Sequence, residues 1–317
     1  MWEKIKLVLL CAIPFVVLTI NHGIRYNKIV TGYTTLDVIN FENTVWITEL
    51  IIAALVEAVY FFSLKIVKER VRLDTDLETA RRVQYGMVPS EHSFEGKGFE
   101  VAAVMQSARN VGGDFYDVIS LDKNRTAIVI GDVSGKGISA ALFMSTSRRI
   151  IRDALFMGCG PSEVLKICNK ELCEENPEGM FLTAFVAVFD NSDNSLTFGN
   201  AGHCRPVLIK EKCEFLSPDP GMALALFDGI EISEGRLELG QGEGILLYTD
   251  GVIEAVDIKN EQFGEGRLLS YVSEKSKDFS EGRASRIVHG VKDAVFAFAG
   301  SKEQFDDITE VALIRMK

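Results

Sequence analysis

The sequence has few histidines and cysteines, and their placement excludes several kinds of metal and redox site. Its four histidines, at positions 22, 92, 203 and 289, are scattered along the chain. The six cysteines form no C-x-x-C pair and no zinc-finger spacing with a histidine. We therefore expect reduced thiols, as in a cytosolic domain, and oxygen ligands for any bound metal.

The chain also lacks an excess of basic residues and two well-known phosphate-handling loops. Its 317 residues carry a net charge of −11 at pH 7. A nucleic-acid surface needs clustered lysine and arginine, so we expect no nucleic-acid partner. No Cys-x5-Arg loop is present, and the Gly135-Lys136 pair lacks both the first glycine and the Ser/Thr of a P-loop.

Apolar runs, by contrast, stand near the N-terminus, and hydrophobic residues make up 47% of the chain. The charge pattern predicts a membrane hairpin at residues 1–66, with helices at about residues 5–20 and 45–66 and an outer loop at residues 21–43. Basic residues precede the first run and follow the second, which predicts a multi-pass inner-membrane protein with both ends in the cytoplasm. The first run is short for a span, so a signal peptide or single anchor is a competing interpretation, and a soluble amphipathic region is another. The second run contains Glu49 and Glu57, which favour an interface or a neighbouring helix.

Residues 67–90 follow as a charged segment that predicts a linker helix. A stripe of mostly apolar or small side chains, interrupted by one glutamine, recurs at 4-3-4-3 spacing, at Leu73, Leu77, Ala80, Gln84 and Met87. This stripe covers about two heptads, so a short coiled coil and a helix that packs on its own domain remain equal alternatives. Gly86 and Pro89 mark the end of the helix.

Glycine-flanked carboxylates are the main feature of the remaining chain. Asp114 follows two glycines and Asp132 follows one, and the residues between them predict two strands around a turn at residues 122–124. Glycine lets a backbone approach a ligand closely, and carboxylates at strand ends suit Mg²⁺ or Mn²⁺. A single Gly-Gly-Asp is more often a tight turn. Three further clusters follow: Asn-Ala-Gly-His at 200–203, Thr-Asp-Gly at 249–251 and Phe-Asp-Asp at 305–307.

These five clusters, in this order, resemble the metal-dependent protein phosphatase (PPM) family, in the SpoIIE/RsbU branch that controls bacterial sigma factors. The resemblance covers residues 81–317. From the residues alone we predict an α+β fold with a carboxylate site at strand ends. The resemblance implies more: residues 91–317 are a SpoIIE-like phosphatase domain, an αββα sandwich of two antiparallel sheets flanked by helices.

The resemblance also implies a metal centre with two Mn²⁺ or Mg²⁺ ions. In it Asp132 bridges both ions, the Val133 backbone carbonyl binds one, and Asp114 and Asp250 add carboxylates, with Asp114 and Asp132 as the catalytic residues. Asp306 aligns best as the last ligand, and Asp307 is the alternative. For each single aspartate, a turn or cap is the ordinary role.

Other polar residues of the motifs have less certain roles. Arg109 and Lys136 are candidates for binding the substrate phosphate. Ser134 stands where many eukaryotic PPM members have a histidine, so protonation of the leaving group must come from water or another group. Asp117 either supports the ligands or lies on the surface. A lone histidine in a turn, such as His203, is more often structural than catalytic.

The function implied is that of a membrane-tethered phosphatase that hydrolyses phosphoserine and phosphothreonine with a metal-activated water. By branch resemblance, its substrate is a phosphorylated anti-anti-sigma (STAS) regulator, and the linker helix forms a homodimer. Two alternatives remain: a catalytically inactive scaffold with the PPM fold, and a hydrolase of small phosphoesters.

Overall fold

A computed structural model describes residues 35–89, 94–96, 98–108, 111–217, 221–278, 282–302, 304 and 306–316. The predicted first membrane helix, at residues 5–20, lies outside these residues, and so does Arg109. The chain divides into two compact units, Met1–Asp76 and Leu77–Lys317.

One helix, α2 (Thr35–Met87), covers the predicted second membrane helix and nearly all of the predicted linker. The outer loop predicted at residues 21–43 is therefore wrong from residue 35 onward. No glycine or proline occurs between residues 35 and 85, so nothing in this stretch breaks the helix before the apolar run begins. Among the described residues, the Asn43–Met87 part of α2 is the one helical stretch long and apolar enough to cross a membrane.

The Leu77–Lys317 unit contains two sheets in which all neighbouring strands are antiparallel. The six-stranded sheet has the order β1 (Phe94–Gly96), β2 (Phe99–Gln106), β11 (Ile308–Arg315), β10 (Gly244–Tyr248), β7 (Val207–Ile209) and β8 (Glu214–Phe215). The five-stranded sheet has the order β3 (Phe115–Ser120), β4 (Arg125–Val133), β5 (Leu182–Asp190), β6 (Ser195–Ala201) and β9 (Glu234–Glu238).

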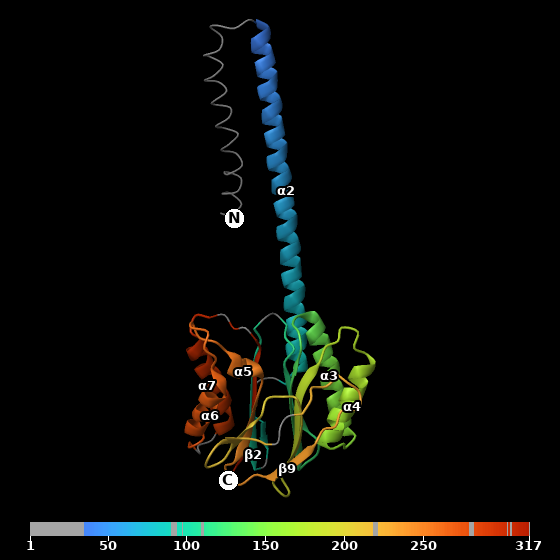
Figure 1. The fold of residues 1–317 in the computed structure, drawn as a ribbon, viewed down its shortest axis with the longest axis vertical. Coiled ribbons are helices and arrows are strands. Elements are labelled where there is room, and N and C mark those ends of the chain that lie inside the picture. Colours follow the sequence, from blue (N-terminus) through green and yellow to red (C-terminus); the bar gives the residue numbers. More distant parts are fainter. Residues whose placement is uncertain are drawn as a thin grey trace. The chain divides into compact units, whose positions relative to one another are not determined.

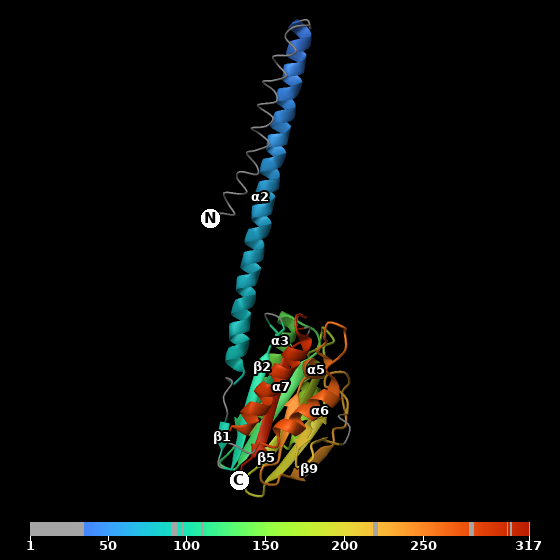
Figure 2. The same cartoon turned by 90° about the vertical axis from the view of Figure 1, so that its left-hand side faces the viewer.

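Helices cover the outer faces of both sheets. The helices α3 (Ile138–Phe156) and α4 (Pro161–Glu174) pack on the five-stranded sheet, whereas α6 (Gly264–Lys275) and α7 (Arg283–Ala299) pack on the six-stranded sheet. The short helix α5 (Asp250–Glu254) lies next to α6 and β11. Figures 1 and 2 show the four layers, with the strands between the two helix pairs. The predicted αββα sandwich is confirmed.

The strand sequences explain this layering, because their side chains are buried on both faces. On β11, Val311 and Leu313 join the core between the sheets, while Ala312 and Ile314 join a second core under α6 and α7. A strand covered on both faces reads as a continuous apolar run, as seen in the sequence from Val311 to Ile314. The first core continues outward to α3 and α4.

Candidate metal centre

The four acidic motifs meet at one edge of the sandwich. Asp114 directly precedes β3, and Asp132 lies near the end of β4, which pairs with β3 in antiparallel register. Asp250 lies two residues after the end of β10, and Asp306 and Asp307 directly precede its antiparallel partner β11. The start of one strand and the end of its antiparallel neighbour share an edge, so each sheet brings its own acidic residues together.

Asp114 is the most enclosed of these side chains. It is 4% exposed, and its Oδ2 accepts hydrogen bonds from Thr249 Oγ1 at 2.8 Å and Thr309 Oγ1 at 2.6 Å. Both threonines belong to the other sheet's edge, so these bonds tie the two halves of the site. Burial, followed by the nearby Asp132 and Asp307 carboxylates, raises the pKa of Asp114 well above its usual range.

Glycine allows two close backbone approaches around these carboxylates. A Cβ on Gly113 would lie 2.5 Å from the Val133 carbonyl oxygen, the oxygen predicted to bind a metal. A Cβ on Gly251 would overlap the carbonyl oxygen of Asp307. Any larger residue at either position would push the strand ends apart, which accounts for a glycine beside an aspartate in each motif.

The two aspartates of the last motif have different surroundings. Asp307 is 7% exposed, and its Oδ1 accepts the Ala108 N–H at 2.8 Å, a contact that fixes the loop. The Asp306 side chain is 34% exposed, and its Oδ2 lies 3.0 Å from Lys136 Nζ. The exposed position of Asp306 favours it over Asp307 as the ligand that faces an incoming ion. This choice stays a prediction.

Mutual repulsion and burial dominate the electrostatics of the cluster. Burial, with smaller effects from Asp250, Asp306 and Asp307, raises the pKa of Asp132 to about 7, although a hydrogen bond with Asp114 opposes the shift. Burial, followed by the charge of Glu254, raises the pKa of Asp250 to about 6. Buried carboxylates that raise one another's pKa form a site whose missing counter-charge a cation can supply.

The donor set fits an ion that prefers oxygen. The gathered side chains are carboxylates, which are the ligands typical of Mg²⁺ and Mn²⁺ rather than of zinc. Among the described residues, no group of three or more acidic, histidine or cysteine side chains is arranged as it stands to hold a metal ion. Carboxylates repel one another, so without a cation between them they lie further apart than metal ligands do.

Other candidate residues occupy supporting positions. Ser134 Oγ accepts the Phe181 N–H at 2.9 Å, and the Ser134 N–H donates to the Phe181 carbonyl, so this serine joins the chain after β4 to the start of β5. Asp117 is buried and accepts from Arg148 and Arg152 of α3. The surface alternative for Asp117 is therefore wrong.

His203 is buried, and its surroundings are those of a structural residue. Its Nδ1 lies 3.0 Å from Thr183 Oγ1, and burial lowers its pKa to about 4. The Asn200 side chain closes the turn, since its Oδ1 accepts the His203 N–H at 2.8 Å and its Nδ2 donates to the His203 carbonyl at 3.1 Å. These contacts agree with the structural interpretation of the Asn-Ala-Gly-His motif.

Three polar residues of the site were not among the predicted site residues, because threonine and glutamine are neither typical metal ligands nor part of the glycine-carboxylate pattern. Thr249 and Thr309 lie inside two of the motifs, one position before Asp250 and two after Asp307. Gln84, from the last turns of α2, is 4% exposed: its Nε2 donates to the Gly112 carbonyl at 2.7 Å and its Oε1 accepts the Gly112 N–H at 3.3 Å. A glutamine in the middle of a predicted apolar stripe was the signal for this contact.

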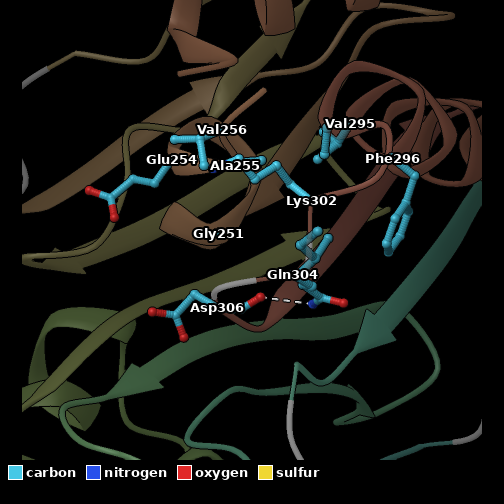
Figure 3. Close-up of a pocket in the computed structure, with 11 residues that line it drawn as sticks. Gly251, Glu254, Ala255, Val256, Val295, Phe296, Lys302, Gln304 and Asp306 are labelled. Atoms are coloured by element: carbon cyan, nitrogen blue, oxygen red, sulfur yellow. Dashed lines mark hydrogen bonds between the residues drawn. The ribbon is translucent and has the colours of Figure 1, made fainter. Parts of the chain in front are cut away.

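A small pocket lies beside the cluster. Its lining includes Gly251, Glu254, Lys302, Gln304 and Asp306. Figure 3 shows the carboxylates of Glu254 and Asp306 on one side of the pocket, away from its apolar wall, and Gln304 Nε2 donating to the Asp306 carbonyl at 2.8 Å. This bond holds the chain just before β11.

Two curated relatives are similar to much of this chain. The protein IcfG of Synechocystis sp. is 30% identical over 269 residues, which are 76% of this chain and 41% of the relative. The phosphoserine phosphatase RsbU of Bacillus subtilis is 28% identical over 184 residues, which are 57% of this chain and 54% of RsbU. The chain thus spans about half the length of these relatives or less.

Solved structures share the fold. The SiaA-PP2C domain of Pseudomonas aeruginosa matches with a TM-score of 0.66 at 18% identity, and the match covers 78% of this chain and 99% of that domain. The catalytic domain of the serine/threonine protein phosphatase PstP, solved with two manganese ions, matches with a TM-score of 0.52 at 15% identity, over 69% and 99% of the two chains. The family described as "Stage II sporulation protein E (SpoIIE)" matches residues 122–315, more than half of the sequence. The chain therefore belongs to the SpoIIE family.

Proposed function

We propose that this chain is a metal-dependent protein phosphatase that hydrolyses phosphoserine and phosphothreonine. The observation that carries the proposal is the group of aspartates at adjoining strand ends, where burial and mutual repulsion raise the pKa of Asp114, Asp132 and Asp250. Similarity to the phosphoserine phosphatase RsbU supports the substrate class. The PstP domain with two manganese ions supports two Mn²⁺ or Mg²⁺ ions.

In this proposal Asp114, Asp132, Asp250, Asp306 and the Val133 carbonyl hold the metals. Bound divalent ions supply Lewis acidity and lower the pKa of water to near neutrality. The protein orients the ligands: Thr249 and Thr309 fix one oxygen of Asp114. Lys136 reaches the rim of the cluster, where its ammonium can attract a phosphoryl group. Ser134 has a weakly acidic hydroxyl that contacts the backbone, so the leaving group takes its proton from water or another group.

The partners and location that we propose follow from the relatives and from α2. The substrate protein is a phosphorylated STAS-type regulator, and the charged end of α2 forms a homodimer. The apolar part of α2 anchors the chain in the inner membrane as one helix of a multi-pass hairpin, with the phosphatase domain in the cytoplasm. Exposed apolar side chains on α2, such as Leu50 at 68% and Phe61 at 67%, support the membrane anchor.

An assay of the full-length chain in detergent tests this function. With Mn²⁺, we expect phosphate release from a serine-phosphorylated protein, and chelator should abolish it. Asp132→Asn should lower kcat/KM more than about 100-fold, since even residues that only support metal ligands cost 10- to 100-fold. Asp153→Asn, on the exposed face of α3, is the matched control and should keep full activity.

Three results would contradict the proposal. Wild-type activity in Asp132→Asn would contradict the assignment of Asp132 to the metal centre. Fast Mn²⁺-dependent turnover of a small phosphoester beside negligible release from phosphoproteins would instead identify a small-phosphoester hydrolase, and no turnover of either would favour a scaffold. Circular dichroism of both variants checks that the fold is retained.

A further inference from the structure

The ion pair between Lys136 and Asp306 brings an ammonium group directly onto a candidate metal ligand. Lys136 Nζ lies 3.0 Å from Asp306 Oδ2, and the two side chains are 30% and 34% exposed. We propose that Lys136 competes with the divalent cation for Asp306, so that metal binding displaces this ammonium and leaves it beside the cluster to bind phosphate. This inference rests on the proposed function.

The oxygens of Asp306 show why the competition is direct. Oδ1 accepts the Asp307 N–H at 3.0 Å, which holds the carboxylate against its own backbone. Oδ2 carries the contact with Lys136. An ammonium donor and a divalent ion seek the same lone pairs and the same negative charge on that oxygen. A metal that takes Oδ2 must therefore replace the lysine.

Replacing the Lys136 ammonium on Asp306 with a divalent ion requires little energy. Ion pairs exposed to this degree contribute about 0.2–1 kcal/mol, because water screens the charges and the long lysine side chain loses entropy. Lys136 lies between Gly135 (φ +88°) and Gly137 (φ +86°), and a Cβ on either glycine would meet open space. The flexible four-carbon stem can therefore move the ammonium without moving β4.

After its displacement, the Lys136 ammonium remains beside the carboxylate cluster, where it can bind phosphate. Burial raises the pKa of both Asp250 and Asp307, and the charge of Lys136 opposes this rise, so its influence reaches several members of the cluster and not Asp306 alone. Lysine binds phosphate as a mobile point charge, and a phosphoryl group bound to the metals would bring two or more anionic oxygens to this rim. Lys136 thus opposes metal binding and favours phosphate binding.

Calorimetry tests this pair of opposite effects in the full-length protein in detergent, after metal has been stripped with chelator. Titration with Mn²⁺ alone should give a Kd about two- to fivefold lower for Lys136→Met than for wild type, as expected from the loss of one weak competing pair. Titration of the Mn²⁺-loaded proteins with inorganic phosphate should give the reverse order, with weaker binding to Lys136→Met. Lys136→Arg should restore phosphate binding.

Two controls separate a direct competition from a general change of charge. Lys302→Met removes a lysine that lines the neighbouring pocket but whose Nζ donates to Asn260 Oδ1 at 3.0 Å. It should leave the Kd for Mn²⁺ within about twofold of wild type, because an exposed charge acts weakly at a distance. Asp306→Asn removes the shared ligand, so adding Lys136→Met to it should no longer improve Mn²⁺ binding.

The outcomes distinguish this inference from the proposed function. An unchanged or higher Kd for Mn²⁺ in Lys136→Met overturns the inference, and so does an equal gain in the Asp306→Asn background. Unchanged phosphate binding also overturns it. If wild type binds no Mn²⁺ at all, both the inference and the proposed function fail.

Discussion

At the scale of single residues, burial decides which polar groups are charged. His203 is 2% exposed, and its Nε2 has no hydrogen-bond partner among the described residues. An imidazolium at this position would lack both water and a counter-ion, so the neutral ring is strongly favoured. The same low-dielectric edge holds Asp114, whose two threonine donors compensate for its burial.

The pH dependence of stability should report the state of His203. Its folded-state pKa of about 4 lies below the unfolded value of about 6.5, so the unfolded chain takes up the proton first as the pH falls. The contribution of the neutral ring is complete above pH 6.5 and is lost between pH 6.5 and 4, a total of about 3 kcal/mol. Denaturant unfolding of wild type and of a histidine variant, compared at pH 7, 5.5 and 4.5, isolates this loss.

The variant His203→Asn separates the effect of the histidine from that of the buried carboxylates, whose protonation changes stability in the opposite direction. Protonation of Asp132 and Asp250, whose pKa values are about 7 and 6, stabilises the fold as the pH falls. The difference in unfolding free energy between wild type and His203→Asn should therefore shrink from pH 7 to pH 4.5. A difference that stays constant would show that the ring of His203 does not titrate in this window.

At the scale of elements, a buried ion cluster joins α3 to β3. Asp117 Oδ2 lies 2.7 Å from Arg148 Nη2 and 2.8 Å from Arg152 Nη1. The carboxylate is 2% exposed and the Arg148 side chain 17%, so water can replace little of the interaction. Strand β3 begins directly after Asp114. The cluster therefore fixes α3 against the strand that presents a candidate metal ligand.

Asp117→Asn should lower the free energy of unfolding by about 2–4 kcal/mol, because two guanidinium groups lose their shared counter-charge. Denaturant unfolding followed by circular dichroism measures the change. Asp153→Asn breaks the exposed pair with Arg149, and it should cost no more than about 0.5 kcal/mol. Equal costs for the two variants would contradict the structural role of the buried cluster.

The regular elements were predictable where local signals agree. The bounds of the helix at Pro161–Glu174 and of the strand at Ile308–Arg315 follow from the local sequence, since proline opens the one and mostly apolar residues form the other. Helix α6 begins at Gly264, where a Phe-Gly pair is more typical of a turn, so the local sequence does not indicate the start of this helix. Strand β9 has a largely polar sequence that does not indicate a strand, and it is formed through its pairing with β6.

The site was predictable only in part, because some of its contacts join residues far apart in the sequence. Its aspartates could be found because Asp114, Asp132 and Asp250 each lie beside a glycine, and the last two form the Asp-Asp pair at 306–307. The contacts of Thr249 and Thr309 with Asp114 join residues 135 and 195 positions apart. The contact of Gln84 with Gly112 joins two elements that the sequence reading treated as separate regions. Local patterns carry no information about such pairs, which only the packed sheets bring together.

At the scale of the whole molecule, α2 carries the apolar run and the packed unit carries the acidic site. The exposed apolar side chains of α2 are unfavourable in water, and a bilayer would bury them. Their position, well separated in sequence from the carboxylate motifs, means that membrane binding and metal binding can be tested by separate variants.

Membrane fractionation of cells that express the full chain tests the anchor. Wild type should sediment with membranes and require detergent for release. Leu55→Arg with Val59→Arg places two charges within the apolar run and should move much of the protein to the soluble fraction, as each arginine costs about 2.5–3.5 kcal/mol at the centre of a span. Leu73→Arg with Val83→Arg, at exposed positions beyond the run, should remain in the membrane. Wild type in the soluble fraction would contradict the anchor.

The paired hydrogen bonds of Gln84 have a mechanical consequence. They clamp both the donor and the acceptor of Gly112, two residues before Asp114, to the last turns of α2. A slide of that helix by one residue, about 1.5 Å along its axis, is half the length of a hydrogen bond. Such a movement must either break both bonds or drag the loop with it. The last turns of α2 and the backbone two residues before a candidate metal ligand therefore keep their relative position only while both bonds remain.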